Sequence, residues 1–140
     1  MKIVLDTNCL LNIIFPESYF RSVWDAFRQQ KYTLCITNEI ISEYREIIER
    51  RTGNAVFADI VIRAILTMPN IEKVEPTYRF NLITEDPDDN KYIDCAITCG
   101  ATFVVSNDKH FNILNSIDWP KVIRLKLIEF AAIIAPPTPV

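Results

Sequence analysis

Short apolar runs alternate with longer amphipathic segments along most of the chain. The runs at residues 3–5 and 102–106 contain β-branched residues and little polar alternation, which indicates strands buried on both faces. Residues 32–37 and 122–125 predict two more strands. Helical spacing of apolar residues predicts helices over residues 18–30, 38–51, 55–68, 86–100, 111–117 and 127–134, and residues 71–82 are expected to be irregular or extended.

Several helix boundaries have recognisable capping residues. Ser18 is the expected N-cap of the first predicted helix, and Gly53 ends the helix over residues 38–51. Asp86 and Pro87 suit the N-cap and the first position of the helix over residues 86–100. Strands that alternate with helices in this way predict the α/β class, with a central, mostly parallel sheet in a three-layer α/β/α arrangement. We expect one domain over residues 1–134 and a mobile, proline-rich tail over residues 135–140.

Composition restricts the class of protein further. The chain has 140 residues, of which 49% are hydrophobic, as in ordered globular proteins. No apolar run reaches the ~18 residues of a membrane helix, and no signal peptide precedes the first strand, so we expect a cytoplasmic protein without membrane contact. The four cysteines lie in apolar runs and are expected to be reduced core residues, with a zinc half-site at Cys95 and Cys99 as the alternative.

Two acidic residues follow predicted strands. Asp6 comes directly after residues 3–5, and Asp108 follows residues 102–106 after Asn107. In open α/β sheets, ligands bind at the carboxyl ends of the strands. A carboxylate buried there is unfavourable unless a positive charge compensates it. The alternative for Asp108 is an ordinary turn residue, because Asn and Asp are common in turns.

Helical periodicity selects Glu43 in the helix over residues 38–51. At ~100° per residue, Glu43 lies at the edge of the apolar stripe. This stripe comprises Ile40, Ile41, Tyr44, Ile47 and Ile48. Glu43 is therefore the acid of this helix that is best placed to face the sheet, and an ordinary surface glutamate at the stripe margin is the alternative.

In the helix over residues 86–100, periodicity selects Asp89. It precedes Tyr92, Ile93 and Ala96 at helical spacing, which places it on the apolar face. The same spacing places Asp94 on the opposite, polar side with Lys91 and Thr98, and Asp88 on the flank. The alternative is that these acids only cap the helix and complement its dipole.

Four acids in one small domain suggest a metal centre. Carboxylates that lie close together raise one another's pKa unless a cation neutralises them. Oxygen ligands of this kind favour Mg²⁺ or Mn²⁺. The net charge of −3 argues against a nucleic-acid partner, but this argument is weak if four of the acids hold metal ions.

The ordered set of motifs resembles the PIN-domain family, the metal-dependent ribonucleases that include VapC-type toxins. The matching pieces are IVLDTNCLL, the glutamate within NEIISEYREII, and DDNKYIDCAITCGATFVVSND, and the resemblance covers roughly residues 2–130. It implies a PIN-like fold in which Asp6, Glu43, Asp89 and Asp108 are catalytic and bind Mg²⁺ or Mn²⁺. It also implies supporting positions that orient the acids or a water, or that assist as a second acid: Thr7, Asn8, Asp88 and Ser106. Asn107 stands where many relatives have Gly or Arg, which affects the fine shape of the site, and Asp94 is a further candidate acid.

The implied activity is metal-assisted hydrolysis of RNA phosphodiester bonds that leaves a 5′-phosphate and a 3′-hydroxyl. His110 either contacts a phosphate or is a solvated loop histidine. Basic residues available for the RNA backbone are Arg45, Arg50, Arg51, Lys91 and Lys109, for each of which surface solvation is the default interpretation.

The resemblance also implies protein partners: a cognate antitoxin that fills the acidic groove, and a second copy of the chain in a homodimer. Apolar residues available for dimerisation are Val56, Phe57, Ile60 and Val61, for which packing in the core is the alternative. We therefore expect an endoribonuclease that is the toxin of a type II toxin–antitoxin pair.

Two other hypotheses remain from the sequence. One is a non-catalytic binding module on the same fold, whose acids are only structural caps. The other is a phosphatase or a phospho-accepting receiver, since both use an aspartate at a strand end. Phosphatases of that kind need a DxDxT motif, and this chain reads Asp6-Thr7-Asn8.

Overall fold

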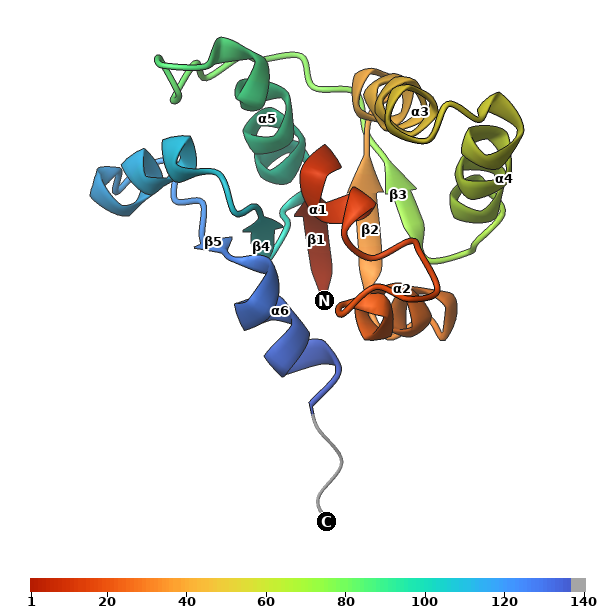
Figure 1. The fold of residues 1–140 in the computed structure, drawn as a ribbon. Helices are drawn as coiled ribbons and strands as arrows, with labels where there is room; N and C mark the ends of the chain where they lie inside the picture. The colour runs from red at the N-terminus through yellow and green to blue at the C-terminus, as the bar shows by residue number, and fades with distance from the viewer. Residues whose placement is uncertain (137–140) are drawn as a thin grey trace.

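Five short strands form one sheet in the order β3-β2-β1-β4-β5 (Figure 1). The computed structural model describes residues 1–136. The strands are β1 (Lys2–Leu5), β2 (Thr33–Ile36), β3 (Ile71–Lys73), β4 (Phe103–Val105) and β5 (Arg124–Leu125). All four neighbouring pairs are parallel, so the predicted α/β class is confirmed, and the sheet is parallel throughout the described residues.

Helices pack on both sides of this sheet and complete the predicted three-layer arrangement. The α-helices are α1 (Thr7–Leu11), α2 (Arg21–Arg28), α3 (Asn38–Thr52), α4 (Ala55–Leu66), α5 (Asn90–Cys99) and α6 (Leu127–Ile134). Two 3₁₀ segments, η1 (Pro87–Asp89) and η2 (Lys109–Ser116), follow β3 and β4. Helix α5 packs against β1, β2 and β4, whereas α2 packs against α6 (Figure 1).

The central strands determine where the polar residues at their ends lie. Ile3 and Val4 are completely buried, and Leu5 of β1 is the register partner of Val105 of β4. The next residue on each strand, Asp6 and Ser106, therefore emerges at the same edge of the sheet. From β1 the chain continues to β2 on one side, whereas β4 lies on the other side of β1. The strand order therefore reverses between β1 and β4, and α/β proteins bind ligands at such switch points.

Helix α3 follows the sequence prediction closely. Thr37 is its N-cap, where the Thr37 Oγ1 accepts a hydrogen bond from the Ile40 N–H at 3.0 Å. Gly53 ends the helix with φ = 64°, a left-handed conformation that disfavours residues with a Cβ. Ile40, Tyr44 and Ile48 are buried, and the Tyr44 hydroxyl donates to the carbonyl of Leu5. This packing directs the Glu43 side of α3 toward the end of β1.

Some predicted boundaries are wrong. Ser18 does not cap α2, which begins at Arg21 after Phe20, because the Ser18 Oγ instead contacts the Asn12 carbonyl and the Phe20 N–H. The segment expected to be irregular or extended from residue 71 does begin with an extended strand, β3. The helix expected from Asp86 begins as a 3₁₀ turn, and the short helix α1 was not predicted.

The prediction that Lys91 and Asp94 lie on the solvent side of their helix is also wrong. Asp94 is 1% exposed and Lys91 is 6% exposed. The segment between β3 and η1 covers this face of α5: the Phe80 N–H donates to Asp94 Oδ1 at 3.1 Å, and Asn90 exchanges two hydrogen bonds with the backbone of Ile83. An inference from helical periodicity assigns the polar face of a helix to solvent. It gives no information about a coil segment that packs over that face.

The remaining sequence expectations concern the cysteines, membrane spans and termini. All four cysteines are buried with free thiols, as expected for reduced core residues. Within residues 1–136, no helix is both long and apolar enough to cross a bilayer. Residues 137–140 of the predicted mobile tail lie outside the described residues.

Candidate active site

An acidic hollow of about 240 Å³ lies at the carboxyl ends of β1 and β4. The four acids that the sequence singled out, Asp6, Glu43, Asp89 and Asp108, all line it. The other lining residues are Thr7, Asn8, Ile47, Arg50, Arg51, Asp86, Asp88 and Tyr92. Segments far apart in the chain (β1, α3, η1 and the end of β4) therefore bring these carboxylates together.

Ser106 connects two of the acids. Asp6 is the N-cap of α1, where its Oδ1 accepts from the Cys9 N–H at 2.8 Å, and its Oδ2 accepts from the Ser106 hydroxyl. The same Ser106 oxygen accepts from the Asp108 N–H at 3.1 Å. Burial raises the pKa of Asp6, an effect that the hydrogen bonds from Ser106 and Cys9 oppose and that the nearby Asp108 reinforces.

Glu43 is compensated by this chain's own groups. Its Oε2 accepts from the hydroxyls of Thr7, at 2.6 Å, and Tyr92, and its Oε1 accepts from Lys91 Nζ at 3.0 Å. Burial by itself would raise the pKa of Glu43, but these three donors outweigh burial, so the pKa lies below its ordinary value. Glu43 is therefore held ionised at neutral pH.

Asp89 is the least compensated acid. It ends η1, its side chain is 16% exposed, and its Oδ2 is buried without a hydrogen-bond partner among residues 1–136. Burial, followed by the charges of Asp86, Asp108 and Asp6, raises its pKa to about 7, and His110 acts in the opposite direction. A cation next to this oxygen would relieve both the missing partner and the repulsion.

The donor set fits a divalent metal ion. Asp86, Asp89 and His110 each offer a ligand atom, and these atoms lie within 4.8 Å of one another. His110 Nδ1 lies 3.3 Å from Asp108 Oδ1 and 3.7 Å from Asp89 Oδ2, and in the described part of the chain this nitrogen is also buried without a hydrogen-bond partner. Carboxylate oxygens suit Mg²⁺ and Mn²⁺, and imidazole is compatible with Mn²⁺ and other transition metals.

The sequence reasoning missed two members of this cluster. The sequence predicts Asp86 only as a helix cap, and its side chain does accept from the Asp88 N–H at 3.3 Å, but it also lines the hollow. His110 has a side chain that is only 25% exposed, and it contacts three carboxylates. The spacing Asp-Pro-Asp-Asp is the available signal for Asp86, since residues three positions apart, such as Asp86 and Asp89, lie on the same side of a 3₁₀ turn.

The supporting residues divide into two groups. Thr7, Asn8 and Asp88 line the hollow, and Asp88, whose side chain is 69% exposed, pairs with Lys91 Nζ at 2.9 Å. Asn107 does not line it: its Oδ1 accepts from the Leu127 N–H at 2.9 Å and so anchors the start of α6. The further candidate acid, Asp94, lies outside the acidic hollow.

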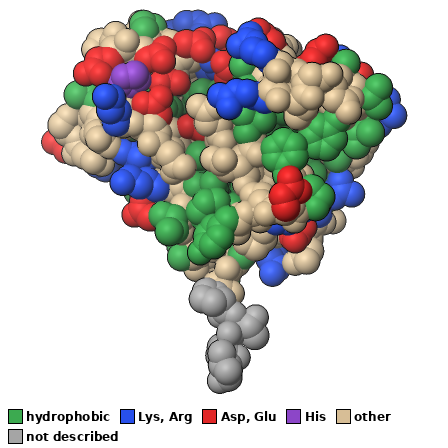
Figure 2. All heavy atoms as spheres, in the orientation of Figure 1, with side chains coloured by type: hydrophobic (Ala, Val, Ile, Leu, Met, Phe, Trp, Pro, Cys, Tyr) green, Lys and Arg blue, Asp and Glu red, His purple; other side chains and the backbone are tan. Residues whose placement is uncertain are grey.

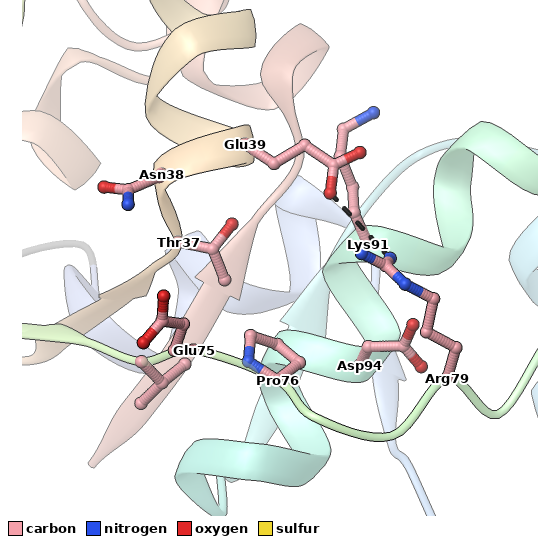
Figure 3. A pocket seen from close by; sticks show the side chains of 9 residues that line it. Thr37, Asn38, Glu39, Glu75, Pro76, Arg79, Lys91 and Asp94 are labelled. Atoms are coloured by element: carbon pink, nitrogen blue, oxygen red, sulfur yellow. Dashed lines mark ion pairs between the residues drawn. The ribbon is translucent and has the colours of Figure 1, made fainter.

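Asp94 lines a separate hollow of about 150 Å³, between the start of α3 and the coil after β3 (Figure 3). Arg79 and Glu39 form an ion pair of 3.9 Å across it. Lys91 also borders this hollow, but its Nζ bonds to Glu43 and Asp88, which belong to the acidic hollow. Lys91 thus separates the two sites.

The sequence model of the family described as PIN domain matches residues 2–110 of this chain. This range includes every acid of the hollow. The chain belongs to the PIN-domain family. The predicted resemblance is therefore confirmed at the level of the family. Comparison of the sequence with curated proteins finds no match.

Solved structures share the fold at low sequence identity. The VapBC2 structure from Rickettsia felis, bound to a DNA fragment from their promoter, matches with a TM-score of 0.60 and 18% identity over 90% of this chain and 98% of that chain. VapC20 of Mycobacterium tuberculosis, described as a sarcin-ricin loop cleaving toxin, matches with a TM-score of 0.57 and 14% identity over 79% and 92%. PAE2754 from Pyrobaculum aerophilum matches with a TM-score of 0.59 and 15% identity over 98% and 91%. These similarities show the shared PIN fold.

Replacement of Ser106 by alanine tests how much the hydrogen bonds to Asp6 and Asp108 contribute. Loss of the buried hydroxyl should lower the free energy of unfolding by about 1–2 kcal/mol. Divalent-ion affinity should fall by about 10–100-fold, as for outer-shell partners of metal ligands, measured by isothermal titration. Ser22→Ala on the exposed face of α2 is the matched control. Unchanged ion affinity in Ser106→Ala would contradict the proposed positioning role.

Proposed function

We propose that this PIN domain is a metal-dependent endoribonuclease that hydrolyses RNA phosphodiester bonds. The observation that carries the proposal is the acidic hollow, in which Asp6, Glu43, Asp89 and Asp108 converge and the Asp89 Oδ2 has no hydrogen-bond partner within the described residues. Membership of a family of nucleases supports it. A set of helix caps without a ligand would leave this buried oxygen unexplained.

Asp6, Glu43, Asp89 and Asp108, the predicted ligands, together with Asp86 and His110, are the groups that would hold Mg²⁺ or Mn²⁺. A bound divalent ion supplies positive charge that stabilises the developing charge on the phosphate and lowers the pKa of water. Glu43 is kept ionised by Lys91, Thr7 and Tyr92, so it adds a permanent negative charge at the wall of the site. Water replaces the 3′ oxygen at phosphorus, which leaves a 5′-phosphate and a 3′-hydroxyl.

The direct test is cleavage of single-stranded RNA by the full chain with Mg²⁺ or Mn²⁺. We expect cleavage that EDTA abolishes and that either ion restores, with 5′-phosphate ends on the products. Isothermal titration of the two ions is the independent measurement, since a binding module with structural caps would show no affinity. RNA cleavage that persists in EDTA, or an absence of ion binding, would remove the proposal.

A toxin role is the finer proposal. Structures of VapC toxins share this fold, one of them described together with its VapB partner. By this analogy the chain would be held inactive by a cognate antitoxin in the cytoplasm. Co-purification of a small partner that suppresses RNA cleavage would support this role. The homodimer remains a prediction: Val56 and Ile60 are exposed and available, whereas Val61 is buried and Phe57 packs partly against the core.

A further inference from the structure

The acidic hollow has a neighbour that the proposed chemistry does not use. A second hollow, of about 590 Å³, lies between the α1–α2 connection and the end of α3. Phe15, Tyr19 and Phe20 supply its aromatic lining, and we call it the Tyr19 groove. Arg51 lines both this groove and the acidic hollow, so one side chain joins them.

Arg51 is available for a ligand. It is an exposed residue in the last turn of α3, and within residues 1–136 it makes no ion pair. Two other arginines of the same helix are engaged: Arg50 bonds to Glu46 at 2.6 Å, and Arg45 bonds to Glu49 at 2.9 Å. A free guanidinium beside a group of carboxylates is suited to an anion that approaches the carboxylates from that side.

Tyr19 offers an exposed aromatic ring in the same groove as Arg51. Its side chain is 86% exposed, and its ring meets that of Phe20 edge-to-face at a centroid distance of 4.9 Å. Phe20 in turn packs partly against the core, as does Phe15, which stacks on Phe57 at 5.7 Å. The Tyr19 ring therefore contacts the partly packed Phe20 and remains largely open to solvent, so a base can reach it.

Acidic, basic and hydrophobic side chains lie close together on this face. Figure 2 shows carboxylates at the upper left, with basic side chains beside them. The carboxylates of the acidic hollow, the Arg51 that lines both hollows and the exposed Tyr19 match the parts of a single-stranded nucleic acid, which alternates phosphates with flat bases. Glu17 also lines the Tyr19 groove, which favours a base there over a further phosphate.

We propose that the Tyr19 groove binds the nucleotide next to the scissile phosphate of a single-stranded RNA. Arg51 contacts a backbone phosphate as the strand leaves the acidic hollow, and the adjacent base stacks on Tyr19. This inference rests on the proposed ribonuclease function and adds to it the path of the strand. Stacking accepts every base, so the groove would position the strand without selecting one sequence.

The test is the equilibrium affinity for a short fluorescent single-stranded RNA, measured by anisotropy in EDTA, where the proposed hydrolysis does not run. Tyr19→Ala should weaken binding about tenfold, and Tyr19→Phe should restore most of it because the ring remains. Arg51→Ala should lower the slope of log affinity against log salt by about 0.7, the value for one phosphate contact on a single strand. An RNA that lacks its bases should bind wild type and Tyr19→Ala equally.

Matched controls are Tyr78→Ala and Arg63→Ala, which remove an exposed tyrosine and an exposed arginine outside both hollows. Affinity that is the same in Tyr19→Ala, Arg51→Ala and wild type would overturn the inference, and would favour a protein segment in the groove. Cleavage with Mg²⁺, assayed in parallel, separates the two proposals. If RNA is cleaved but neither variant changes affinity, only the inference fails; if affinity changes as expected without cleavage, only the nuclease proposal fails.

Discussion

Asp89→Asn is expected to remove metal-dependent RNA cleavage while it raises the stability of the metal-free protein. The amide keeps the shape of the side chain but removes the charge that Asp6, Asp86 and Asp108 repel. Changes to outer partners of metal ligands already cost about 10–100-fold, so loss of a direct ligand should exceed a hundredfold in activity. The thermal midpoint in EDTA should rise by a few degrees at neutral to mildly alkaline pH.

The pH dependence follows from the raised pKa. In the folded chain Asp89 has a pKa of about 7, compared with an ordinary value of 3.8. Between these two values the folded state holds a proton that the unfolded state releases. The stability contributed by protonated Asp89 is therefore complete below the lower value and is lost as pH rises toward 7. Metal-free wild type should lose stability over this range, and Asp89→Asn should lose less.

Asp118→Asn, at an exposed position outside the acidic hollow, is the control. Its thermal midpoint and its response to pH should match those of wild type. Addition of Mn²⁺ should raise the midpoint of wild type and of the control but not that of Asp89→Asn, because a ligand that binds only the folded state stabilises it. A lower midpoint for Asp89→Asn in EDTA would show that this carboxylate is not repelled as the structure indicates.

The acids at the strand ends could be predicted from the sequence for a physical reason. A strand buried on both faces has a distinctive apolar composition, and the residue after it must emerge at the sheet edge. The parallel register of Leu5 with Val105 then places Asp6 beside the chain that leads to Asp108. The position of Glu43 could be predicted for a similar reason, since α3 is regular and its buried stripe of Ile40, Tyr44 and Ile48 fixes its rotation against the sheet.

The contacts of irregular segments could not be predicted in this way. Asp86 and His110 approach Asp89 from the start of one 3₁₀ turn and from within another, and in such turns the angle between successive side chains differs from that of an α-helix. Lys91 and Asp94 are buried because a coil segment without periodic pattern covers them. Helical periodicity predicts which face of one regular element packs against the core. The surroundings of these residues depend instead on irregular segments, whose course has no periodic pattern.

Lys91→Met is the substitution with the largest expected effect on stability. The Lys91 side chain is 5% exposed, and its Nζ lies 3.0 Å from Glu43 and 2.9 Å from Asp88. Methionine matches its length and apolar stem but leaves Glu43 without its cation in a partly buried position. We expect a loss of about 2–3 kcal/mol in the free energy of unfolding, less than the ~3–5 kcal/mol of a fully buried pair because the Glu43 side chain keeps access to water.

Chemical denaturation measures this loss, and the pH range over which it appears identifies its cause. Burial lowers the pKa of Lys91, but its bonds to Asp88 and Glu43 outweigh burial and raise the pKa above 10.5. The pKa of Glu43 lies below 4.5. The contribution of the pair is therefore present between these ordinary values, disappears as pH falls through the lowered pKa of Glu43, and disappears as pH rises through the raised pKa of Lys91.

A double-mutant cycle separates the charge pair from packing. Glu43→Gln in the Lys91→Met background should recover part of the lost stability, because no unpaired charge then remains beside the apolar side chain. Lys121→Met, at an exposed position, should change stability by less than about 0.5 kcal/mol. If the double variant is as unstable as the sum of the two single variants, Lys91 stabilises the chain through its packed stem rather than through Glu43. Recovery would instead show that Lys91 provides Glu43 with the positive charge that Asp89 lacks, which explains why these two acids of one site have pKa values displaced in opposite directions.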